Sequence, residues 1–126
     1  MEQEYIKGDI VMYNNKIHTI MDTLGLNNYE LSYINHPVHQ LELSGVPVTP
    51  EILKKNGWKK EMYHDWRHYI PLERTLLYLS RCADRDRDDA FNVCVGLNMS
   101  HIAYISFVHQ LQHIFFSLNI NHEMEV

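Results

Sequence analysis

Two histidines lie four residues apart in the segment HQLQH, at positions 109 and 113. On a helix this spacing brings both imidazoles to one side, within reach of a single metal ion. The metalloprotease motif, however, needs a glutamate directly after the first histidine as general base, and Gln110 cannot accept a proton. No third ligand is indicated elsewhere in the chain. We therefore interpret His109 and His113 as exposed polar side chains of a helix, and we expect no metal and no other cofactor.

Other groupings that could perform chemistry are equally incomplete. The run DRDRDD at residues 84–89 alternates carboxylates with arginines, which is typical of a solvated hairpin tip, and it lacks the glycine and distal glutamate of a calcium-binding loop. Cys82 and Cys94 are expected to be free thiols that point to opposite faces of a hairpin. With no phosphate-binding glycine loop and no Ser-His-Asp arrangement, we expect a protein without enzymatic activity or a small-molecule substrate.

Composition indicates one compact α+β domain spanning residues 1–126. The chain has 126 residues, of which 45% are hydrophobic, and a formal net charge of −5. This acidity disfavours a broad electrostatic grip on nucleic acid. The N-terminal segment lacks the pattern of a signal peptide, and no segment is long and apolar enough to span a membrane, so we expect a cytoplasmic location.

Alternating apolar residues in the N-terminal third of the chain predict strands that are separated by two turns. Residues 4–13 and 16–24 flank Asn14 and Asn15, which tolerate the positive φ angles of a tight hairpin turn, and residues 29–34 form a third strand. This order predicts an SH3-like β-meander.

A short central helix follows within VTPEILKKNGWKK, residues 48–60. Thr49 is the expected N-cap and Pro50 the first helical residue. Gly57 suits the left-handed position after the helix, which directs Trp58 onto Leu53.

The second half of the chain predicts an antiparallel sheet from residues 66–73, 75–82, 90–97 and 101–105. We expect the second and third of these strands to pair with Ala83 opposite Ala90. That register gives one core face, consisting of Leu76, Tyr78, Ser80, Cys82, Phe91, Val93, Val95 and Leu97.

An amphipathic helix closes the chain over residues 106–119, with Ser106 as N-cap and Asn119 in the left-handed conformation at its end. We expect it to cover one face of a sheet, and we expect the residues after it to be frayed.

The stretch MYHDWRHYIPLE is rich in the residue types that carry most of the energy at protein interfaces. Strand alternation sends Trp66 and His68 to one side and Arg67 and Tyr69 to the other. The predicted partner-binding residues are Tyr63, Arg67, Tyr69, Arg85 and Arg87. The alternative is an edge strand whose arginine and tyrosines only cover apolar surface.

The segments PVTPEILKKNGW and VHQLQHIFFSLN carry a resemblance that extends in order over most of the chain. In these stretches the chain resembles a group of small uncharacterised proteins encoded by phages and prophages of Bacteroidota bacteria. That group has asparagine at the position of His113. The resemblance implies a mobile-element accessory protein and brings no activity with it.

From this resemblance and the missing catalytic groups we expect an anti-defence protein that binds and inhibits a host immune effector in the bacterial cytoplasm. The expected target is an RNA-guided CRISPR effector, a ribonucleoprotein in which guide RNA is also available for contact. One alternative is a nucleic-acid-binding phage accessory protein, and a second is a structural component of the phage. Phosphate contacts would make nucleic-acid binding steeply dependent on salt, which distinguishes these hypotheses.

Overall fold

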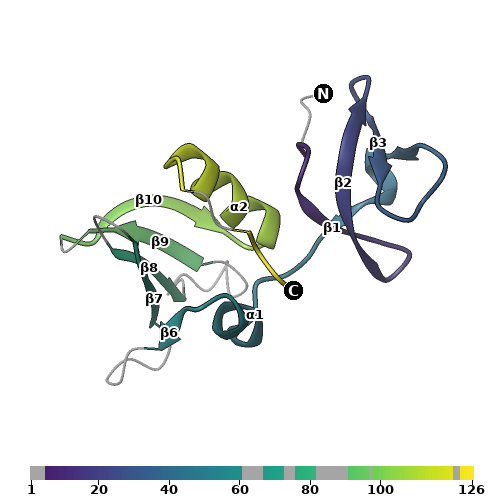
Figure 1. The fold of residues 1–126 in the computed structure, drawn as a ribbon. Coiled ribbons are helices and arrows are strands. Elements are labelled where there is room, and N and C mark those ends of the chain that lie inside the picture. Colours follow the sequence, from purple (N-terminus) through teal and green to yellow (C-terminus); the bar gives the residue numbers. More distant parts are fainter. Residues whose placement is uncertain (1–4, 61–66, 73–75, 82–90, 97, 121–122) are drawn as a thin grey trace. The chain divides into compact units, whose positions relative to one another are not determined.

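The chain is a mixed α+β protein with two mainly antiparallel sheets and a C-terminal helix, as expected (Figure 1). The computed structural model describes residues 5–60, 67–72, 76–81, 91–96, 98–120 and 123–126. Internal contacts divide the chain into two compact units. Unit 1 comprises Met1–Pro47 and Phe107–His122, and unit 2 comprises Val48–Ser106 and Glu123–Val126. The expectation of one domain over residues 1–126 stays a prediction.

Unit 1 contains a five-stranded antiparallel sheet in the order β4-β3-β2-β1-β5. Its strands are β1 (Ile10–Tyr13), β2 (Lys16–Leu24), β3 (Asn28–Leu31), β4 (Val38–His39) and β5 (Ser44–Gly45), with the 3-10 helix η1 (Gln40–Glu42) before β5. The β1–β2 turn is the expected one, because Asn14 and Asn15 have φ angles of 49° and 63°.

The core of unit 1 consists of side chains that alternate along these strands toward one side. It contains Tyr5, Val11, Ile20, Tyr29, Leu31 and Val38. The hydroxyl of Tyr29 is kept satisfied inside this core, because it donates to Gln40 Oε1 at 3.1 Å.

Unit 2 begins with α1 (Pro50–Lys55), whose ends are formed as the sequence predicts. Thr49 Oγ1 accepts a hydrogen bond from the Ile52 amide at 3.2 Å. Gly57 has a φ angle of 87°, and the Trp58 amide then donates to the Leu53 carbonyl at 3.0 Å. Leu53 and Trp58 are both buried, so this helix end directs the tryptophan into the core of unit 2.

The sheet of unit 2 is fully antiparallel and has the order β10-β9-β8-β7-β6. Its strands are β6 (Lys59–Lys60), β7 (Arg67–Pro71), β8 (Leu76–Arg81), β9 (Phe91–Val95) and β10 (Ser100–Ile105). The expected outward position of Arg67 and Tyr69 is confirmed, because His68 and Ile70 are buried on the opposite face.

The register expected between β8 and β9 is wrong by one residue. Tyr78 pairs with Cys94 and Leu79 with Val93, so the buried face holds Leu77 and Leu79 instead of Tyr78 and Ser80. A shift of one residue turns every side chain of a strand to the other face. Residues 82–90, which include Cys82, lie outside the described residues, and Cys94 is a buried free thiol.

The C-terminal helix α2 (Val108–Ser117) belongs to unit 1, where it contacts β1. Its N-cap is Phe107, one residue later than expected. Asn119 has the expected positive φ angle of 57°, and the Ile120 amide donates to the Phe115 carbonyl at 2.8 Å. In the part of the chain that the structure describes, no helix has the length and apolar character needed to cross a membrane.

The last four residues are not frayed as expected. The Glu125 backbone exchanges two hydrogen bonds of 2.7 Å with the side chain of Asn56, which lies at the end of α1. Met124 beside it is buried. The tail is therefore an integral part of unit 2.

Candidate functional site

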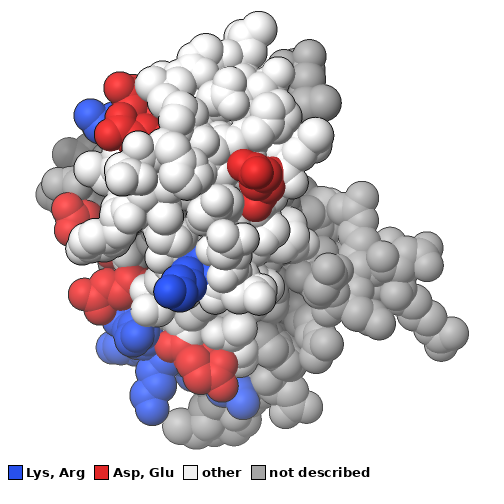
Figure 2. Space-filling model, turned by 90° about the vertical axis from the view of Figure 1, so that its right-hand side faces the viewer, with Lys and Arg blue, Asp and Glu red and all other residues white. Residues whose placement is uncertain are grey.

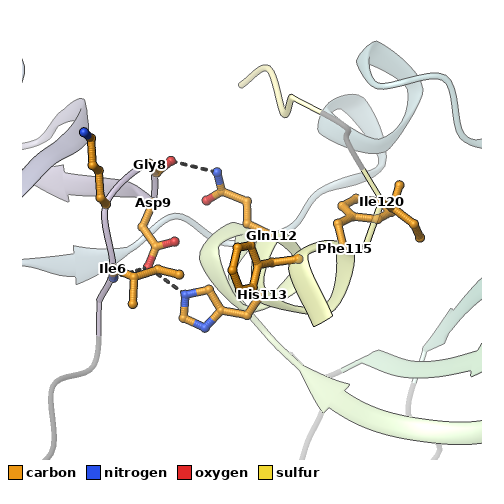
Figure 3. A pocket seen from close by; sticks show the side chains of 9 residues that line it. Ile6, Gly8, Asp9, Gln112, His113, Phe115 and Ile120 are labelled. Atoms are coloured by element: carbon orange, nitrogen blue, oxygen red, sulfur yellow. Dashed lines mark hydrogen bonds and ion pairs between the residues drawn. The ribbon is translucent and has the colours of Figure 1, made fainter. Parts of the chain in front are cut away.

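The HQLQH segment forms one side of a hydrogen-bonded network with the segment before β1, which we call the Asp9 network (Figure 3). His113 Nε2 donates to Asp9 Oδ2 at 2.7 Å, and the Ile6 amide donates to the same oxygen at 2.9 Å. Asp9 is 2% exposed, so both donors compensate a carboxylate that has lost its water.

The neighbouring glutamine of the motif binds backbone groups on both sides of Asp9. Gln112 Oε1 accepts from the Ile10 amide at 2.9 Å, while its Nε2 donates to the Gly8 carbonyl at 3.0 Å. Gln110 has a local role, because its Oε1 accepts from the Phe107 amide at the start of the helix. The polar residues of HQLQH therefore hold α2 onto the N-terminal segment of unit 1.

His109 is 2% exposed, so the interpretation of both histidines as exposed polar residues is wrong. Its ring lies edge-on to Tyr5 at 4.8 Å and is stacked with Phe107 at 5.8 Å, measured between ring centroids. Helix periodicity could not show this, because Tyr5 is more than a hundred residues away in the sequence.

The pKa values of the two histidines are shifted in opposite directions. The hydrogen bond to Asp9 raises the pKa of His113 above its ordinary value, although partial burial opposes the rise. Burial lowers the pKa of His109, and the nearby His113 lowers it further while Asp9 opposes both. Compared with a free histidine, the protonated form of His113 and the neutral form of His109 are therefore favoured.

A cavity of about 210 Å³ adjoins the Asp9 network in unit 1 (Figure 3). Its lining includes Asp9 and His113, an orientation pair that also occurs in hydrolase triads. None of its nine lining residues carries a hydroxyl or thiol that could act as nucleophile. His113 is hydrogen-bonded to Asp9 and has no hydroxyl or thiol to activate among the lining residues, so this arrangement favours a structural role. Across the described ranges, no group of three or more His, Cys, Asp or Glu side chains has a geometry suited to a metal ion.

A second candidate site is the face of the unit 2 sheet opposite its buried side, which we call the tyrosine face. Strand pairing arranges its residues in two rows across the strands. One row consists of Lys59, Tyr69, Tyr78, Cys94 and His101, and the other of Arg67, Ser80, Asn92 and Tyr104.

Exposure differs sharply between the two faces of this sheet. Leu77, Leu79 and Val93 are each 0% exposed on the buried face. On the tyrosine face, Tyr104 is 51% exposed and Tyr69 is half-buried. Partly exposed tyrosines on a sheet face can present ring surface to a partner while their edges pack on neighbours.

The aromatic rings of the tyrosine face lie close to one another. Tyr69 and Tyr78 are paired across β7 and β8 with ring centroids 6.3 Å apart. The His101 and Tyr104 rings are 4.5 Å apart on β10, and His101 Nδ1 is hydrogen-bonded to Asn92 Oδ1. These contacts order the side chains before any partner arrives, which reduces the entropy lost on binding.

The charge of the tyrosine face is opposite in sign to that of the chain. Its described residues include Lys59 and Arg67 but no Asp or Glu, although the chain has a formal net charge of −5. On the side of the molecule drawn in Figure 2, basic and acidic side chains alternate along one margin and uncharged residues cover much of the rest. A local basic site is therefore compatible with an acidic protein.

Two of the five predicted partner-binding residues are brought together, since Arg67 and Tyr69 share the tyrosine face. Tyr63, Arg85 and Arg87 lie outside the described residues. The sequence interpretation did not include the other members of the face, which are Lys59, Tyr78, Ser80, Asn92, Cys94, His101 and Tyr104. The incorrect register placed Tyr78 in the core, whereas the alternation in SHIAYI was a usable signal for Tyr104.

No family model matches the chain, and no curated protein or solved structure is significantly similar to it.

Proposed function

We propose that the chain is a non-enzymatic anti-defence protein of a phage or prophage, which binds and inhibits a host immune effector in the bacterial cytoplasm. The proposed target class is an RNA-guided CRISPR effector. The observation that carries this proposal is the tyrosine face, a preordered set of tyrosines with an arginine and a lysine on an exposed sheet surface. Tyrosine and arginine are the residue types that dominate binding energy at protein interfaces.

The Asp9 network supports a binding protein over an enzyme. Its polar groups are engaged in holding the helix, and its cavity has no hydroxyl or thiol among the lining residues. The chemistry-bearing residues of unit 1 thus have a structural explanation.

We further propose that unit 1 is an SH3-like barrel that supports the rest of the chain. Three features favour this topology: five antiparallel strands, β5 paired beside β1, and a 3-10 helix directly between β4 and β5. Fold alone does not assign a partner to such a barrel.

The proposal is tested by expressing the intact chain in a Bacteroidota host that carries an active RNA-guided CRISPR system. The host is challenged with a phage that carries a matching target sequence. The efficiency of plaquing should rise compared with cells that carry an empty vector, and a phage without the target should plaque equally in both. Equal plaquing of the targeted phage with and without the chain would contradict the proposal.

A further inference from the structure

We propose that the tyrosine face binds single-stranded RNA. This inference deepens the proposed function and rests on it in one respect: both assign the same face, and an RNA-guided effector presents RNA to an inhibitor. All residues of the tyrosine face belong to unit 2.

The rings on this face have the spacing needed to stack bases. Adjacent strands lie about 4.8 Å apart, and alternate residues of one strand about 6.8 Å apart. Tyr69, Tyr78 and Tyr104 are distributed over three strands of this grid, and the first two have ring centroids 6.3 Å apart. Single-stranded nucleic acids bind sheet surfaces by stacking successive bases on such rings.

Polar and cationic groups lie between and beside the rings. Lys59 is exposed at the end of the row that contains Tyr69 and Tyr78. Arg67 begins the second row, which continues through Ser80 and Asn92. Cations neutralise phosphates, while hydroxyl and amide groups can hydrogen-bond to base edges or the 2′-hydroxyl.

The sign of the charge on the face favours RNA as the occupant. In the core of a protein interface about two thirds of the area is apolar, and most charged residue types are depleted there. Most described residues of the face are aromatic, polar or cationic. The exceptions are Leu76, Pro71 and the buried thiol of Cys94. The absence of carboxylates among these residues removes the main source of repulsion toward phosphates.

The test uses the intact chain and a short fluorescein-labelled uridine-rich RNA without secondary structure, measured by fluorescence anisotropy. Wild-type protein should bind it saturably. The double variant Tyr69→Ala/Tyr104→Ala should weaken binding about a hundredfold, because each stacked base contributes about tenfold. Tyr33→Ala is the matched control, since Tyr33 is a fully exposed tyrosine of unit 1, and its variant should bind as the wild type does.

Salt provides a second readout that a purely structural defect would not reproduce. With phosphate contacts from Lys59 and Arg67, the slope of log K against log salt should be about −1.4, or about −0.7 per contact on a single strand. Lys59→Glu should make this slope shallower, whereas Lys16→Glu in β2 should not. Circular dichroism of every variant confirms that loss of binding is not loss of folding.

Absence of saturable RNA binding by folded wild-type protein would overturn the inference, as would equal binding by the double variant and the wild type. These outcomes are separable from the proposed function. If the chain raises plaquing and binds the effector protein after nuclease treatment, but does not bind the labelled RNA, the face contacts protein and only the RNA inference fails. If the labelled RNA binds but plaquing does not change, the inference stands and the anti-defence proposal fails.

Discussion

Asp9→Asn is the most informative perturbation of unit 1, because one buried carboxylate orders both the helix and the segment before β1. The substitution preserves shape but removes the charge that His113 Nε2 approaches at 2.7 Å. A charge-assisted hydrogen bond contributes about 1.5–3 kcal/mol to stability. Since the His113 side chain is 35% exposed, solvent screens the pair, and we expect a loss of about 1.5 kcal/mol in the free energy of unfolding.

The pH dependence of this contribution follows from the direction of each pKa change. The pKa of His113 is raised by Asp9, so its stabilisation is fully present below the unfolded pKa of about 6.5 and is lost as pH rises through the folded value. The pKa of His109 is lowered by burial, so its contribution is present above the unfolded value and is lost as pH falls toward the folded one. The two histidines together should therefore stabilise unit 1 most at a pH between the folded pKa of His109 and the folded pKa of His113.

Nuclear magnetic resonance of the histidine ring protons measures both titrations directly. In the wild type, His113 should titrate above its ordinary value and His109 below it. Asp9→Asn should lower both pKa values, because the Asp9 charge raises each of them. Exchange of the Ile10 amide hydrogen, which donates to Gln112, should also accelerate. An unchanged His113 titration in the variant would refute this account of the network.

The remaining predictions concern packing, the tail and metal binding. Gly45→Ala should destabilise unit 1 by about 1–3 kcal/mol in chemical denaturation, because its Cβ would lie 2.4 Å from the Phe107 ring; a neutral effect would contradict this contact. Asn56→Ala should release the C-terminal tail, seen as faster exchange of the Glu125 amide hydrogen, while exchange at the wild-type rate would show that the tail is held otherwise. Purified protein should contain no stoichiometric zinc by elemental analysis, and one tightly bound zinc per chain would reopen the metal interpretation. Replacing both histidines of the C-terminal helix with alanine should lower stability, because one is buried and the other is paired with Asp9, and a neutral effect would contradict these contacts.

Features governed by neighbouring residues were predictable from the sequence. Thr49 and Gly57 delimit α1, and Asn119 ends α2, because caps and left-handed residues act within one turn. The Asn14-Asn15 hairpin was predictable for the same reason.

Features governed by distant contacts were not predictable. The β8–β9 register depends on a long connection without a decisive turn signal, so Tyr78 was assigned to the wrong face. The role of HQLQH depends on Asp9, which is 104 residues from His113 in the chain. Strand alternation showed only Arg67 and Tyr69 of the tyrosine face, and the assignment of the other residues to it required the strand pairing.

In the proposed function, the chain blocks a host immune effector through its tyrosine face. The most direct measurement is the efficiency of plaquing of a targeted phage in CRISPR-active cells that express the wild type, Tyr69→Ala/Tyr104→Ala, or the Tyr33→Ala control at equal levels of folded protein. We predict protection by the wild type and the control, and none by the double variant. Equal protection by all three proteins would contradict the claim and assign the inhibitory surface to another part of the chain.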